Sequence, residues 1–117
     1  MRVITLNVNG IRSAARKGLY RWLAAQKADV VCLQEIKAHD ADLDATMRAP
    51  RGLHGRFSHA DKKGYAGVAL YSRMRPDAVR EGFGVKEFDD EGRYLEARFD
   101  AALPEDVFSL SRLERSR

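Results

Sequence analysis

The sequence predicts a mixed α+β (α/β) domain, and three observations near its start carry that prediction. Residues 2–8 (RVITLNV) alternate between two faces and are rich in β-branched side chains, as is typical of a strand. From Ser13 the apolar positions take a helical period, and residues 29–35 (DVVCLQE) then form a continuous apolar run, as in a strand covered on both faces. A strand, a helix and a strand in this order indicate a crossover, so we expect the two strands to be parallel neighbours.

The predicted helix has Ser13 as its N-cap, because a serine hydroxyl can accept a hydrogen bond from a free N–H of the first turn. An apolar stripe spaced i, i+4, i+7 and i+8 predicts the face that packs on the sheet, and it consists of Ala15, Leu19, Trp22 and Leu23. The other face is basic. We therefore expect one amphipathic helix between the two strands.

Residues 38–52 predict a short helix and a loop. Asp40, Asp42 and Asp44 alternate there as in a calcium loop, but the glycine and the terminal glutamate of such a loop are missing, which favours an exposed helix. Further along, residues 56–59 and 66–71 predict two strands joined by a turn at 61–64, and so a hairpin.

Two further strands are predicted in residues 77–84 (DAVREGFG) and 92–100 (GRYLEARFD), joined by a turn at 89–92. The second of them alternates Leu95, Ala97 and Phe99 against polar neighbours. Residues 101–117 show no clean period, and we expect neither a strand nor a core helix in them.

Length and composition indicate one small domain. The chain has 117 residues, 44% of them hydrophobic, and no apolar run near the roughly 20 residues that a membrane helix needs. Polar residues interrupt the first ten positions, unlike a signal peptide, so we expect a cytoplasmic protein with no membrane partner. The single cysteine, Cys32, lies within the apolar run and is expected to be a buried small side chain, and the three histidines have no zinc-ligand spacing.

The net charge is +4, and every charged residue before Asp29 is basic. This asymmetry favours an anionic partner, although a solvated helix face would give the same pattern.

Two polar residues stand at the ends of the predicted parallel strands, Asn7 on the first and Glu35 on the second. Sites in α/β sheets gather at such ends, and a carboxylate beside an amide oxygen suits Mg²⁺, which keeps several of its waters. From these residues alone, a helix-capping or surface role for Glu35 stays open.

Four blocks, LNVNGIR, DVVCLQEIK, KGYAGVALYSR and DDEGRYLEARFD, together resemble the N-terminal half of exodeoxyribonuclease III and the apurinic/apyrimidinic endonucleases of the endonuclease/exonuclease/phosphatase superfamily. The resemblance covers residues 2–100. The LQE segment alone would also admit phosphoinositide phosphatases, sphingomyelinases and DNase I-like enzymes, whereas the third and fourth blocks favour the DNA repair branch.

The resemblance implies the N-terminal part of a four-layer α/β/β/α sandwich of the DNase I-like type. Residues 1–100 would then be a partial domain, and residues 101–117 a divergent tail, for which we hypothesise a frameshifted or prematurely stopped gene. The full-length family is expected to be monomeric. Half of such a sandwich would expose an apolar sheet face and unpaired edges, which predicts a marginal or aggregation-prone protein.

The resemblance also implies roles for individual residues. Asn7 and Glu35 would hold Mg²⁺ or Mn²⁺, with Asn9 in support. The residues implied to contact DNA are Arg12, Lys37, Gly64 and Tyr65. Arg93 would help to order the site. Without the resemblance, Arg12, Lys37 and Tyr65 would be interpreted as solvated surface residues.

The implied function is that of a Mg²⁺-dependent DNA phosphodiesterase acting on double-stranded DNA at abasic sites or 3′ ends. The family residues that activate the attacking water belong to the half that is not matched here, and no histidine of this sequence replaces them, so we expect no complete catalytic set. The alternative is a non-catalytic DNA-binding remnant, or a fragment that needs a complementary partner.

Overall fold

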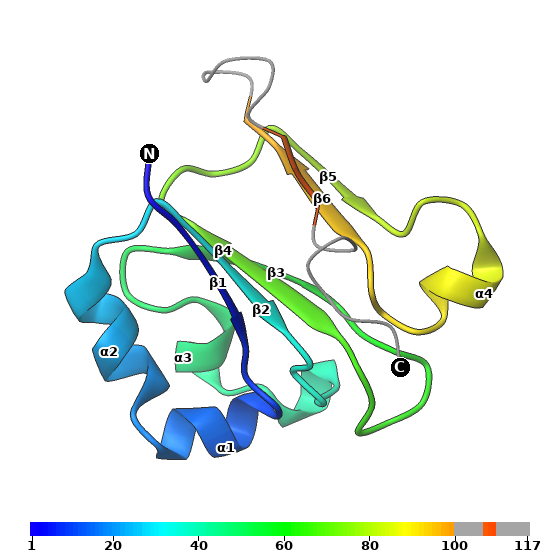
Figure 1. The fold of residues 1–117 in the computed structure, drawn as a ribbon, viewed down its shortest axis with the longest axis horizontal. Helices are drawn as coiled ribbons and strands as arrows, with labels where there is room; N and C mark the ends of the chain where they lie inside the picture. The colour runs from blue at the N-terminus through cyan, green and yellow to red at the C-terminus, as the bar shows by residue number, and fades with distance from the viewer. Residues whose placement is uncertain (100–106, 110–117) are drawn as a thin grey trace.

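The computed structural model describes residues 1–99 and 107–109, which form two sheets, with the helices of residues 11–48 on the outer side of the first sheet (Figure 1). The strands are β1 Val3–Asn7, β2 Val30–Gln34, β3 His54–Ser58, β4 Val68–Ser72, β5 Ala78–Glu81, β6 Leu95–Arg98 and β7 Val107–Ser109. The helices are α1 Ile11–Arg16, α2 Leu19–Gln26, the short 3₁₀ helix η1 Asp40–Asp42, α3 Ala45–Arg48 and α4 Lys86–Asp89.

The first sheet has the strand order β1-β2-β4-β3 and the second the order β5-β6-β7. β1 and β2 are parallel, with Asn7 opposite Gln34, while every other pair is antiparallel. The α+β fold, the parallel start and the hairpin of β3 and β4 are thereby confirmed. Among the described strands β1 pairs only with β2, and its Val3 and Leu6 are 44% and 36% exposed.

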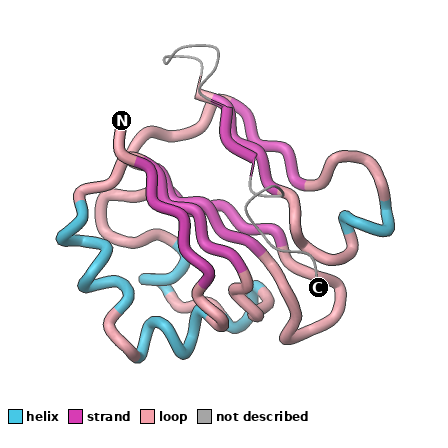
Figure 2. Tube along the Cα trace, viewed as in Figure 1, coloured by secondary structure: helices cyan, strands magenta, loops and turns pink. Residues whose placement is uncertain are grey.

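β2 is buried on both faces, as its apolar run predicts. Val31 and Leu33 belong to a core cluster shared with α1, α2 and α3, whereas Val30 and Cys32 pack in a second cluster with Leu95 and other residues of β4 and β6. The three layers are therefore helices α1, α2 and α3, the four-stranded sheet and the β5–β7 sheet. Figure 2 shows these three helices as cyan segments on one side of the four-stranded sheet, whereas α4 lies on the other side, beside the β5–β7 sheet. Among the described residues no helix is long and apolar enough to cross a membrane.

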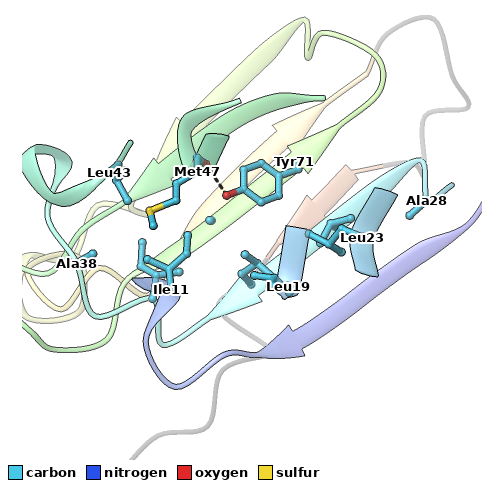
Figure 3. Close-up of a cluster of buried hydrophobic side chains, with 12 residues drawn as sticks. Ile11, Leu19, Leu23, Ala28, Ala38, Leu43, Met47 and Tyr71 are labelled. Atoms are coloured by element: carbon cyan, nitrogen blue, oxygen red, sulfur yellow. Dashed lines mark hydrogen bonds between the residues drawn. The ribbon is translucent and has the colours of Figure 1, made fainter. Parts of the chain in front are cut away.

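Tyr71 on β4 ties the helical layer to the sheet (Figure 3). Its side chain is fully buried, and its hydroxyl donates to the Met47 carbonyl oxygen of α3 at 2.5 Å and lies 2.8 Å from the Tyr20 hydroxyl of α2. Burial raises the pKa of both tyrosines, that of Tyr20 to about 12. Both phenols therefore stay neutral hydrogen-bonding groups within the core.

The single predicted helix is wrong in detail, because the structure has two helices with a break at Gly18. Gly18 has φ of +97°, a left-handed conformation that a glycine adopts without steric cost, and this turns the chain between α1 and α2. The N-cap of α1 is Gly10, so Ser13 does not cap it. Trp22 falls outside the buried stripe and is 46% exposed.

Asp42 and Asp44 act as local caps, whereas Asp40 pairs with Arg48. The Asp44 side chain accepts a hydrogen bond from the Met47 N–H at the start of α3, and Asp42 accepts one from the His39 N–H, which lowers the pKa of Asp42. No group of three or more potential metal ligands exists in the described part of the chain. The prediction of a short helix in residues 38–52 is confirmed by η1 and α3.

Two elements were not predicted. α4 lies between β5 and β6, where Asp89 accepts hydrogen bonds from the N–H groups of Phe83 and Gly84 at 3.0 Å and closes the turn. β7 forms within the tail and pairs antiparallel to β6, so the expectation of no strand there is wrong for residues 107–109. The apolar Val107 and Phe108 have high strand propensity, and the neighbouring edge of β6 supplies the backbone partners. The rest of the tail lies outside the described residues.

Cys32 is fully buried, as expected, and burial raises the pKa of its thiol to about 12. We expect the folded protein at pH 8 to resist a thiolate-directed reagent, and the urea-unfolded protein to react fully. The pKa of Cys32 is higher in the folded than in the unfolded protein. The contribution of Cys32 to the free energy of unfolding is therefore constant below about pH 9 and is lost as the pH rises toward 12. Labelling kinetics with and without urea check this, and rapid labelling of the folded protein would contradict it.

Candidate metal and phosphate site

The candidate site lies where the parallel strands β1 and β2 end. Asn7 is the last residue of β1 and Glu35 follows β2, so the parallel register brings both to one edge of the sheet. The Asn7 Nδ2 atom donates a hydrogen bond to Glu35 Oε2 at 2.6 Å, and Asn7 Oδ1 accepts one from the Asn9 N–H at 3.0 Å. The sequence prediction that these strand ends meet is confirmed.

Glu35 is 5% exposed, which is unusual for a carboxylate. Its Oε1 atom lies 3.8 Å from Lys37 Nζ, and Lys37 Nζ donates to Asn9 Oδ1 at 2.5 Å. Asn7, Asn9, Glu35 and Lys37 therefore form one connected polar network. A buried carboxylate held from two sides keeps its orientation without relying on solvent.

The backbone around this network takes an uncommon conformation. Of the five non-glycine residues with positive φ in the described chain, four belong to this region: Asn9, Glu35, Lys37 and Ala66. Left-handed backbone costs roughly 1–2 kcal/mol per non-glycine residue, and such residues gather where a site fixes the chain. The strained positions thus mark the same place as the polar network.

Glu35 is one of the residues that line a cleft of about 590 Å³. The cleft is lined by Glu35, Lys37, Gly64, Tyr65, Ala66, Glu91 and Arg93. These residues come from the loop after β2, the loop before β4 and the segment before β6. A volume of this size holds a phosphodiester group with several waters, since one water takes about 30 Å³ of the liquid.

The rim of the cleft carries an aromatic ring and cationic side chains, together with the Glu91 carboxylate. Tyr65 is 56% exposed, with Lys62 Nζ 4.2 Å from its ring centroid. Arg93 Nε lies 3.3 Å from Glu91 Oε1 across the exposed side. A flat ring and several cations around an open mouth can lie against a sugar-phosphate backbone without reading bases.

Arg12 is placed differently from the other predicted site residues. It does not line the cleft, and its guanidinium lies 3.5 Å from the Lys37 carbonyl oxygen and 3.8 Å from Asp42. Sequence analysis missed Ala66 and Glu91 as lining residues, although both lie within quoted blocks, next to Tyr65 and Gly92. Their place in the cleft could have been inferred only by assuming that the third and fourth sequence blocks lie next to Glu35 in the fold.

The donor set fits a hard cation that retains water. The described chain brings one buried carboxylate and two asparagine side chains together, with no histidine or thiolate beside them. Mg²⁺ takes one or two protein carboxylates and keeps several waters, which matches this set, whereas protein Zn²⁺ sites are built mainly from histidine nitrogen and cysteine sulfur.

Comparison with known proteins places this arrangement in a family. A family model described as "Endonuclease/Exonuclease/phosphatase family" matches residues 4–116. The chain belongs to the endonuclease/exonuclease/phosphatase family. The resemblance noted in the four sequence blocks is confirmed by this match.

Within the endonuclease/exonuclease/phosphatase family, the chain is similar to an exodeoxyribonuclease of Bacillus subtilis, with 37% identity over 110 residues. It is 32% identical over 100 residues to a DNA-(apurinic or apyrimidinic site) endonuclease of Dictyostelium discoideum. The structure of an AP endonuclease from Archaeoglobus fulgidus superposes with a TM-score of 0.73 at 33% identity, covering 86% of this chain.

These relatives are much longer. The matched segment is 93% of this chain but 42% of the Bacillus protein, 86% of this chain but 27% of the Dictyostelium protein, and 37% of the Archaeoglobus chain. The chain thus spans less than half the length of each.

Proposed function

We propose that this chain supplies the metal-binding half of the active site of a Mg²⁺-dependent DNA phosphodiesterase that acts on double-stranded DNA at abasic sites or 3′ ends. The observation that carries the proposal is the buried Glu35 carboxylate, held by Asn7 and Lys37, at the base of a cleft that Lys37, Tyr65 and Arg93 also line. The names of the relatives, an exodeoxyribonuclease and AP endonucleases, support DNA as the substrate.

In this proposal Glu35 holds Mg²⁺ or Mn²⁺, and the Asn7 side chain orients the Glu35 carboxylate or joins it as a ligand. When bound, the cation supplies Lewis-acid stabilisation of the phosphate and of the leaving alkoxide. Lys37 neutralises a phosphate oxygen, and Asn9 fixes the Lys37 ammonium. Gly64 and Tyr65 pack against the duplex, while Arg93 orders the far wall together with Glu91.

A second candidate is a non-catalytic DNA-binding piece; a fragment that nicks only with a complementary partner would still use the Glu35 site and belongs with the first proposal. The support for the non-catalytic candidate is that the described residues place no histidine in the cleft, and the remaining carboxylate there, Glu91, is paired with Arg93. A general base must lie within hydrogen-bond reach of the attacking water, and the described part of the cleft offers no obvious one. Among the described strands, one edge of β1 has no neighbouring strand. A strand of a complementary fragment could pair with this edge.

An abasic-site nicking assay separates these candidates. The chain is assayed alone with Mg²⁺, and again after mixing with the part of the Bacillus subtilis relative that lies beyond the matched segment. We expect no nicking by the chain alone and Mg²⁺-dependent nicking by the mixture, because the second piece would bring the missing water-activating groups.

The alternative outcomes are distinct. Nicking by the chain alone, abolished in Glu35→Ala, would refute the non-catalytic candidate. Salt-dependent duplex binding with no nicking under either condition would support the non-catalytic candidate, because phosphate neutralisation alone gives such binding.

A further inference from the structure

Two histidines join the loops that lie behind the cleft. His39 Nε2 is 2.7 Å from the carbonyl oxygen of Ala60, and His59 Nδ1 is 2.7 Å from the carbonyl oxygen of Ala38. Each ring therefore reaches the backbone of the residue that adjoins the other histidine. The ring centroids are 5.9 Å apart, and Ala38 and Ala60 are both buried.

The partners fix which nitrogen of each ring carries hydrogen. A carbonyl oxygen only accepts, so His39 must donate from Nε2 and His59 from Nδ1. The His59 Nε2 atom is buried and has no hydrogen-bond partner among the described residues. A ring that carries its hydrogen on Nδ1 leaves Nε2 bare, so no N–H is buried there without an acceptor. His59 also stacks on Phe57, with 1° between the ring planes.

The segment held by these histidines is where the two walls of the cleft meet its base. The Lys37 N–H donates to the Ala66 carbonyl oxygen at 2.8 Å, which fixes the wall of Gly64 and Tyr65 against the loop after β2. The Asp61 N–H donates to the Asp90 carbonyl oxygen at 2.7 Å, just before Glu91 and Arg93 of the opposite wall. Residues 59–61 therefore connect both walls to the base.

We propose that His39 and His59 are positioning residues, which as a reciprocal pair of hydrogen-bond donors set the two cleft walls relative to Glu35. Neither histidine lines the cleft, so the pair acts through the backbone of Ala38 and Ala60. That the two walls act on DNA rests on the proposed function, whereas the hydrogen-bond pairing of the two histidines does not depend on it.

Amide side chains offer a matched test. The asparagine nitrogen lies about as far along the side chain as histidine Nδ1, and the glutamine nitrogen about as far as Nε2. His39→Gln with His59→Asn therefore keeps both donors, while His39→Asn with His59→Gln introduces the same two residue types with both donors misplaced. We expect amide hydrogen exchange at Lys37 and Asp61 to rise about tenfold or more in the second variant and to stay within about threefold in the first.

Duplex-DNA affinity, measured by fluorescence anisotropy at fixed salt, should fall in the second variant and be kept in the first. Equal exchange rates in the two double variants would overturn the proposal. If exchange differs as expected but the unsubstituted chain neither binds duplex DNA nor nicks it when mixed with the complementary piece, the proposed function fails while the pairing stands.

The tautomers give a second measurement that needs no variant. Long-range ¹⁵N–¹H correlation spectra of the unsubstituted chain at pH 8 should show the Nε2–H form for His39 and the less common Nδ1–H form for His59. Observation of the Nε2–H form for His59 would contradict the proposal even if a double variant failed to fold.

Discussion

Replacing Glu35 by glutamine should reduce the affinity for Mn²⁺, used as a probe of the Mg²⁺ site, by about 100-fold or more. Removal of groups that merely support a metal ligand already costs 10- to 100-fold, and Glu35 is the only buried carboxylate in the described cleft. Glutamine keeps an oxygen that can accept from Asn7 Nδ2, so the fold should survive the change. Mn²⁺ binding followed by electron paramagnetic resonance measures the affinity, and thermal unfolding checks the fold.

Glu91→Gln is the matched control, because Glu91 lines the same cleft but is exposed and paired with Arg93. We expect this change to alter Mn²⁺ affinity by no more than about threefold, since an exposed charge acts through screened solvent. An equal loss in both variants would mean that the overall negative charge of the cleft, and not the Glu35 carboxylate, holds the cation.

The fold and the centre of the site follow from local sequence patterns. The continuous apolar run of β2 predicts a strand buried on both faces, and a crossover between parallel strands is enough to bring Asn7 beside Glu35. Both inferences use only side-chain period and chain direction. The assignment of Glu35 to a metal site stays a prediction, and its support comes from burial and from the cleft.

The parts that sequence analysis missed depend on contacts between distant segments. His39 and His59 each bond a carbonyl oxygen 21 residues away, and no local pattern records such a partner. The two helices in place of one could have been anticipated from Gly18, because a glycine within an apolar stripe is a signal for a break. β7 has no period of its own and exists as a strand through its pairing with β6.

Gly92→Ala should be the most destabilising single methyl addition near the cleft. Gly92 has φ of +61° and is buried, and a Cβ placed there would lie 2.3 Å from the Ala60 nitrogen and 2.3 Å from the His59 carbonyl carbon. Both are backbone atoms, so the clash cannot be relieved by a side-chain rotation. We expect a loss of about 3 kcal/mol or more in the free energy of unfolding, from left-handed strain and overpacking together.

Gly52→Ala separates these two causes. Gly52 also has a left-handed backbone, with φ of +81°, but an added Cβ would meet nothing within 4 Å. We expect it to cost about 1–2 kcal/mol, the strain alone. Urea unfolding gives both values. Similar losses of unfolding free energy in the two variants would show that Gly92 is not closely packed against the His59–Ala60 backbone. A larger loss in Gly92→Ala, together with weaker duplex binding, would show that the contact between the β5–β6 connection and the His59 segment holds the cleft in shape, because that contact links Glu91 and Arg93 to the wall that carries Tyr65.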